Sequence, residues 1–137
     1  MIRGRNGSGL RRGMTTVECA VVYPVTILLV LGTIIVGVGV FRYQQLQALA
    51  REGARYASVH GPAYATATGE AQASTSSVLS YLEGMAVGLN GLECTSVSYS
   101  STTLPCTVSV TLSYTWKPEG YFASSTWTPT STMAVTY

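Results

Sequence analysis

The sequence lacks most of the side chains on which hydrolytic and metal-dependent enzymes depend. It contains no aspartate, one histidine and six glutamates. These residues are not spaced as metal ligands, and the chain has neither a G-x-S-x-G motif nor a phosphate-binding glycine loop. We therefore expect no enzymatic activity, no catalytic residues, no metal site and no cofactor.

Charge is also scarce. Charged residues make up 10% of the chain, against about a quarter in typical domains. The formal net charge is +2, but four of the eight basic residues are arginines within the first 13 positions. The remaining chain carries four basic and six acidic side chains, a net charge of −2. We therefore expect no nucleic-acid-binding surface.

The chain does contain a long uncharged stretch, which runs for 23 residues from Cys19 to Phe41. At about 1.5 Å of rise per residue, a helix of this length covers the roughly 30 Å hydrocarbon core of a bilayer. Four arginines precede the stretch and only Arg42 directly follows it, so the N-terminus should be cytoplasmic and the C-terminal part periplasmic or extracellular. The sequence thus predicts a single-pass membrane protein with a flexible leader at 1–13 and a transmembrane helix at 14–41.

Glu18 lies one residue before this stretch. It is either a boundary residue that reaches the head groups or a functional charge that a partner neutralises. A basic leader, Gly13, four residues, Glu18 and an apolar run resemble the substrates of prepilin peptidases, in which cleavage follows the glycine, here before Met14, and glutamate is fifth in the mature chain. A secretory signal peptide fits less well, because its apolar core has only about 7 to 15 residues and precedes a small-residue cleavage site.

A wider resemblance rests on four blocks: Arg12-Gly13, Val-Glu-Cys-Ala-Val-Val-Tyr-Pro at 17–24, Gln-Gln-Leu-Gln-Ala at 44–48, and Arg-Glu-Gly-Ala-Arg-Tyr-Ala at 51–57. Together they resemble the TadE/TadG-like pseudopilins, minor pilin-like proteins of the tight-adherence, or Flp-type, pilus machinery. The resemblance covers about residues 11–61, and the final third only in its style of alternating strands. Cys19 departs from the family, which usually has an aromatic residue after the glutamate.

The resemblance implies a pilin-like fold and a role in assembling a tight-adherence, type IV-like pilus or its secretion machinery. It implies four partners: a prepilin peptidase, other pilins or pseudopilins that contact the transmembrane helix, an inner-membrane assembly platform, and the membrane itself. Glu18 would accept the charge of a neighbouring subunit's cleaved N-terminal amine. The alternative is an unprocessed, single-pass anchored exterior domain that binds an envelope or surface partner.

Within the predicted span, Pro24 removes a backbone donor to the carbonyl of Ala20, which should kink the helix or break it locally. Thr26 or a second helix packed alongside could compensate. Small residues further on form one face, which either permits close helix approach or consists of ordinary membrane-helix residues: Gly32, Thr33, Gly37 and Gly39.

Beyond the span, the pattern predicts an α+β fold. Apolar residues at helical spacing continue the membrane helix over 42–61, as far as His60-Gly61-Pro62, where His60 would act as a cation at the helix end. Residues 62–137 should form a small exported domain.

Within that domain we expect a loop at 62–69 and a second, shorter helix from about Gly69 to Leu89. Apolar alternation predicts a strand at 106–116, a shorter partner near Val97 and Tyr99, and a last strand at 130–137. The expected result is a small antiparallel sheet of about three strands.

Cys94 and Cys106 are the two cysteines of the predicted exterior part. An oxidising compartment and a turn at Leu104-Pro105 favour a disulfide that closes a loop of about 13 residues and contributes roughly 3 kcal/mol. The alternative is a pair of buried free thiols. Cys19, within the span, should behave as a small apolar residue.

Overall fold

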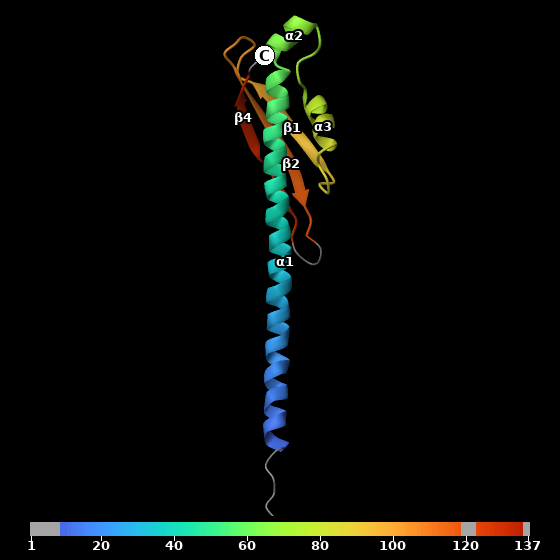
Figure 1. Cartoon of the computed structure of the whole chain (residues 1–137), viewed down its shortest axis with the longest axis vertical. Helices are drawn as coiled ribbons and strands as arrows, with labels where there is room; N and C mark the ends of the chain where they lie inside the picture. The colour runs from blue at the N-terminus through green and yellow to red at the C-terminus, as the bar shows by residue number, and fades with distance from the viewer. Residues whose placement is uncertain (1–8, 119–122, 136–137) are drawn as a thin grey trace, which may run out of the picture. The chain divides into compact units, whose positions relative to one another are not determined.

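The computed structural model describes residues 9–118 and 123–135, with side chains from residue 15 onward. Its elements are three helices and four strands (Figure 1): α1 (Gly9–Val59), α2 (Pro62–Thr68), α3 (Thr75–Glu83), β1 (Leu92–Tyr99), β2 (Thr107–Trp116), β3 (Ser125–Trp127) and β4 (Thr130–Ala134). The long N-terminal helix, short helices and small antiparallel sheet form the α+β fold that the sequence predicts.

The chain divides into two compact units, Met1–Val38 and Gly39–Tyr137, and α1 contributes to both. We call the second of these the C-terminal unit. The helix is 51 residues long and runs through Pro24, so the proline does not end it. It begins at Gly9, inside the predicted leader, whose first eight residues lie outside the described part of the chain. Its end at Val59 agrees with the predicted stop at 60–62.

The core of the C-terminal unit lies where α1, α3 and the sheet meet. Strands β1 and β2 run beside α1, with α3 next to them (Figure 1). A Cβ built on Gly53 would lie 3.1 Å from Leu82 Cδ1 and 3.2 Å from Val78 Cγ1, so the glycine permits close packing of α3 on α1. The largest fully buried side chains come from all three layers: Leu46, Val78, Leu82, Val108, Val110 and Leu112.

β2 is the central strand of the sheet. β1 pairs with it antiparallel along one edge, whereas β3 pairs with residues 114–116 and β4 with residues 107–111 along the other. Its buried positions alternate as predicted, and the opposite face carries hydroxyls that pair across strands at 2.8 Å (Ser109–Thr132), 2.9 Å (Thr111–Thr130) and 3.1 Å (Thr115–Thr126). Each pair joins directly opposite residues, which stabilises the register without charge.

Two parts of the helical prediction are wrong. Residues 62–68 form a helix instead of a loop, because Pro62 is favourable in the first turn and Gly69 closes the helix at φ 76°. The second predicted helix is also shorter than expected and begins at Thr75. Ser74 caps it: its hydroxyl accepts from the Ser77 N–H at 3.3 Å, and its own N–H donates to the Ser77 hydroxyl at 2.8 Å.

The sheet has four strands where about three were predicted. The additional strand, β3, has only three residues and ends at Trp127. Pro129 follows it and cannot donate to a ladder, but its carbonyl accepts a hydrogen bond from Leu112 N–H at 3.1 Å. This bond keeps the chain beside β2 between β3 and β4.

The predicted disulfide is contradicted by the strand register. Cys94, near the start of β1, lies opposite Leu112, whereas Cys106 directly precedes β2 at its other end. The offset of six residues corresponds to about 20 Å along the strand, and a disulfide requires Cα atoms within about 7 Å. Both thiols are free, with Cys106 buried and Cys94 half-buried, and burial raises the pKa of the Cys94 thiol.

Tyr99 secures the C-terminal end of α1. Its hydroxyl donates to the carbonyl oxygens of Ala57 at 3.0 Å and His60 at 3.3 Å, at the end of a helix, where carbonyls have no following turn to bond. The His60 carbonyl also accepts from the Ala73 N–H at 2.9 Å. Burial, with a smaller effect from Cys106, raises the pKa of Tyr99 from 10.0 to about 12. Because folding raises this pKa, the stability from Tyr99 is complete below about pH 10 and is lost as the pH rises towards 12.

We expect Tyr99→Phe to lower the free energy of unfolding at neutral pH by about 0.5–1.5 kcal/mol. The variant should also lose less stability than the wild type between pH 10 and pH 12. Denaturant unfolding of the full chain in detergent, followed by tryptophan fluorescence, measures both effects. Tyr23→Phe, which changes an exposed hydroxyl on α1, is the control. Identical pH profiles for wild type and Tyr99→Phe would refute the assignment.

Candidate functional site

The predicted processing and assembly residues all lie on the N-terminal part of α1. The Gly13–Met14 bond is within the helix, and Glu18 follows about 7 Å further along its axis. Glu18 is exposed, and Cys19 beside it is partly exposed. The structure therefore places the carboxylate on the helix surface, where a partner can reach it.

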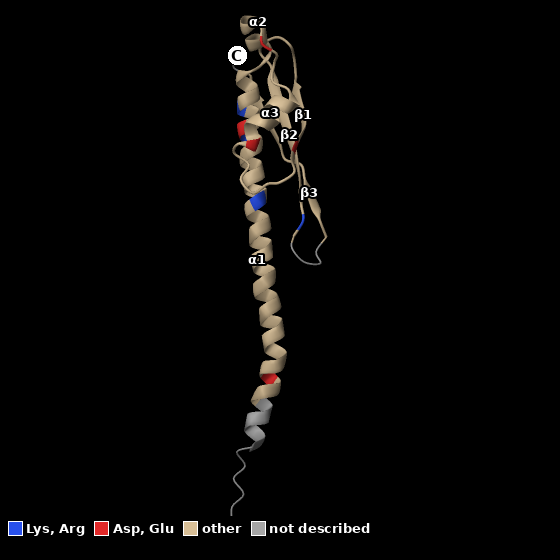
Figure 2. Cartoon of the chain, turned by 90° about the vertical axis from the view of Figure 1, so that its right-hand side faces the viewer, with Lys and Arg blue, Asp and Glu red and all other residues tan. Residues whose placement is uncertain are grey.

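The surface of α1 after Glu18 is apolar. The sequence has no charged residue on α1 between Glu18 and Arg42, and the ribbon of Figure 2 carries no red or blue over this part of the helix. The most apolar 18-residue window of the helix is 0% buried by the rest of the described chain. Exposed fractions reach 70% for Leu28 and 67% for Leu29. This helix is long and apolar enough to cross a membrane, which would shield these side chains from water.

The threonines of this segment satisfy their hydroxyls within the helix. Thr26 Oγ1 donates to the carbonyl of Val22 at 2.9 Å, and Thr33 Oγ1 to that of Leu29 at 2.8 Å. Thr26 therefore does not satisfy the Ala20 carbonyl, which loses its backbone donor at Pro24, and that expectation is wrong. The second expectation, a helix packed alongside, stays a prediction.

The predicted small-residue face is divided between two environments. A Cβ built on Gly32 or Gly37 meets nothing within 4 Å, whereas one on Gly39 would lie 2.9 Å from Trp116 Cη2. Gly39 thus lets the Trp116 ring pack closely against α1 within the C-terminal unit. Only Gly32 and Gly37 leave open space that a second helix could fill.

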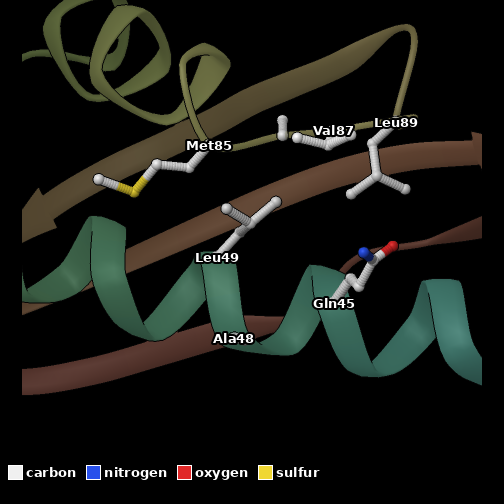
Figure 3. Close-up of a pocket in the computed structure, with 7 residues that line it drawn as sticks. Gln45, Ala48, Leu49, Met85, Val87 and Leu89 are labelled. Atoms are coloured by element: carbon white, nitrogen blue, oxygen red, sulfur yellow. The ribbon is translucent and has the colours of Figure 1, made fainter.

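Two of the surface depressions on the described part of the C-terminal unit differ in chemistry. The first, of about 170 Å³, is lined mainly by apolar side chains of α1 and of the segment after α3 (Figure 3): Gln45, Ala48, Leu49, Met85, Ala86, Val87 and Leu89. Val87 on its rim is 81% exposed. The second, of about 370 Å³, is polar and is lined by Arg42, Asn90, Gly91, Glu93, Tyr114, Thr115 and Lys117. Arg42 Nη1 donates to Tyr114 Oη at 3.1 Å.

Sequence reasoning did not predict an aromatic cluster in the C-terminal unit. Trp127 stacks on Trp116 with ring centroids 5.3 Å apart and meets the edge of Tyr43 at 5.7 Å. The alternation of β2 places Trp116 on the inward face. The strand that carries Trp127, in contrast, has only three residues, too few to show a pattern in the sequence. A second group of rings surrounds the end of α1, where His60 stacks on Tyr56 at 4.2 Å.

Comparison with known proteins gives one result that bears on this helix. The family model described as TadE-like protein matches residues 13–55. No curated protein and no solved structure matches the chain. The match begins at Gly13 and contains Glu18 and the apolar stretch, but neither α3 nor the sheet. The resemblance to the TadE-like family, which we inferred from the sequence, is confirmed over these residues.

Proposed function

We propose that this chain is a TadE-like minor pilin, or pseudopilin, that acts in assembly of a tight-adherence, type IV-like pilus or its secretion machinery. The observation that carries the proposal is the family match over residues 13–55, which starts at the glycine of the processing pattern. The apolar surface of α1 supports it, since the described chain leaves that surface uncovered. The role is structural and requires no catalysis by this chain.

Processing would set the mature N-terminus. With residues 1–13 in the cytoplasm, a prepilin peptidase would hydrolyse the peptide bond between Gly13 and Met14. The four arginines of the leader would leave with it, and Met14 would gain a free amine. The mature chain would then enter the bilayer with an ammonium and the Glu18 carboxylate separated by about one helical turn.

Glu18 would act between subunits. A carboxylate near the end of a membrane span costs free energy, though less than one at the bilayer centre, and a positive charge beside it offsets that cost. The ammonium of a neighbouring subunit's Met14 would supply that charge, and the poorly hydrated surroundings make the pair strong when both members are present. Gly32 and Gly37, which have open space around them, would let other pilin helices approach, while the inner-membrane assembly platform receives the processed subunit.

The mass of the intact protein tests this function most directly. Protein purified from membranes of a cell with an active prepilin peptidase should lack residues 1–13, whereas protein from a peptidase-deficient strain should retain them. An unprocessed chain in both strains would overturn the proposal. That result would favour an anchored exterior domain that binds an envelope or surface partner.

A further inference from the structure

Aromatic and cationic side chains gather at the end of the C-terminal unit that contains residues 39–41, the last residues of the uncharged stretch. We define this end, the aromatic-cationic end, by Arg42, Tyr43, Trp116, Lys117 and Trp127. We propose that it docks onto the phospholipid headgroup layer of the bilayer that α1 crosses. The inference rests on the membrane-spanning part of the proposed function and is independent of processing and pilus assembly.

The contact between Trp116 and Gly39 places this end at the membrane boundary. Gly39 lies two residues before Phe41, the last residue of the uncharged stretch. It is buried, and the Trp116 ring occupies the position that a side chain there would take, 2.9 Å from the built Cβ. Trp116 is the last residue of β2, so the strand reaches down to the part of α1 that leaves the hydrocarbon core.

The inward row of β2 changes composition as it approaches this boundary. Val108, Val110 and Leu112 are fully buried, whereas the next two positions of the same row are Tyr114 and Trp116. Trp116 and Trp127 are only partly buried, and Tyr43 is 42% exposed. Rings with an apolar body and one polar N–H or O–H favour the membrane–water interface, where both parts are satisfied.

The cations lie where lipid phosphates would be. Arg42 and Lys117 line the same polar depression of about 370 Å³, together with the opposing charge of Glu93. The hydrogen bond to Tyr114 Oη holds the Arg42 guanidinium at 3.1 Å, and Lys117 is exposed. Arginine and lysine are the usual protein donors to phosphate, and each contributes to binding at anionic lipid surfaces. The phosphates of phospholipid headgroups lie at the membrane–water interface, which is also where the aromatic rings are favoured.

The chain's own fluorescence provides the test, because Trp116 and Trp127 are its only two tryptophans. The full chain would be reconstituted in phosphatidylcholine–phosphatidylglycerol vesicles with spin labels at the headgroup, in the upper acyl chain or in the deep acyl chain. We expect strong quenching by the two shallow labels and weak quenching by the deep label. Trp116→Phe and Trp127→Phe assign the signal to each ring while keeping an apolar side chain.

The cations are tested in the same vesicles. If Arg42 and Lys117 bind phosphate, changing either residue to glutamine should reduce the ratio of docked to undocked protein about fivefold. Quenching of the tryptophans by the two shallow labels should fall accordingly. Arg51→Gln is the matched control, because Arg51 is exposed on the same helix about 13 Å further from the boundary. Added inorganic phosphate should not mimic the effect of anionic lipid, because the aromatic-cationic end binds the headgroup layer of the bilayer and not a free phosphate ion.

Three results would overturn the proposal. Resistance to alkaline extraction shows whether α1 is inserted, and an inserted protein whose tryptophans no lipid label quenches would reject docking while leaving the anchor intact. Quenching that disappears as protein is concentrated in the bilayer would show that a second copy covers this end. Extraction of the protein at alkaline pH would show that α1 does not span the membrane. Both this inference and the proposed function would then fail.

Discussion

Replacing Gly13 with leucine should leave residues 1–13 attached to nearly all of the protein. The peptidase implied by the TadE-like resemblance accepts a small residue before the scissile bond, and leucine adds a branched side chain at that position. Insertion should continue, since the uncharged stretch from Cys19 to Phe41 and the four arginines before it are unchanged. The predicted variant is therefore a membrane protein that keeps its leader.

Intact mass and gel mobility of membrane fractions would measure this effect. Gly4→Leu, the same change elsewhere in the predicted leader, is the matched control and should be processed normally. Because the uncleaved variant has no free amine at Met14, pilus-dependent attachment should be lost even at normal protein levels. Wild-type mass for Gly13→Leu would show that cleavage, if it occurs, does not follow this glycine.

The long helix could be predicted because its signals are local and repeated. An uninterrupted apolar stretch leads into residues at helical spacing, and the stop at Gly61-Pro62 is specific. Pro24 was the weak point of that prediction. The structure shows that a single proline does not end a helix of 51 residues, because one missing backbone bond is small beside the many that remain.

The disulfide prediction failed because it weighed sequence separation and compartment but not register. The buried row of β2, from Val108 to Tyr114, must face α1 and α3, and this fixes how β1 lies along it. An irregularity between Cys94 and Ser96 shifts the pairing further. Cys94 thereby lies opposite Leu112, and no turn at the far end of the strands can bring it to Cys106.

Some residues of the candidate sites could be predicted from the sequence, and others could not. Gly13 and Glu18 were found from a motif in which spacing alone carries the signal. The contact of Trp116 with Gly39, in contrast, joins residues 77 positions apart in the sequence, and β3 has only three residues. Tertiary packing creates the aromatic-cationic end, so neither periodicity nor composition could have indicated it.

Replacing Glu18 with glutamine should abolish assembly without removing the protein from the membrane. Glutamine keeps the size and helix propensity of glutamate. It removes a charge that costs about 2.5 to 3.5 kcal/mol at the centre of a membrane helix and less near an interface, so insertion should be unchanged or slightly easier. If Glu18 pairs with a neighbour's ammonium, the variant leaves that ammonium without a counter-charge, a loss of about 3 to 5 kcal/mol when the pair is fully buried.

That loss corresponds to a hundredfold or greater decrease in the subunit association constant, at about 1.4 kcal/mol per factor of ten. Pilus-dependent attachment and cross-linking to pilin partners should fall together, while mass and membrane level stay those of the processed wild type. Glu83→Gln, which neutralises an exposed carboxylate at the end of α3, controls for the change in net charge. Were a stable, processed Glu18→Gln protein to assemble normally, Glu18 would be a boundary residue that reaches the head groups, and pairing between subunits would have to rest on the apolar surface of α1 alone.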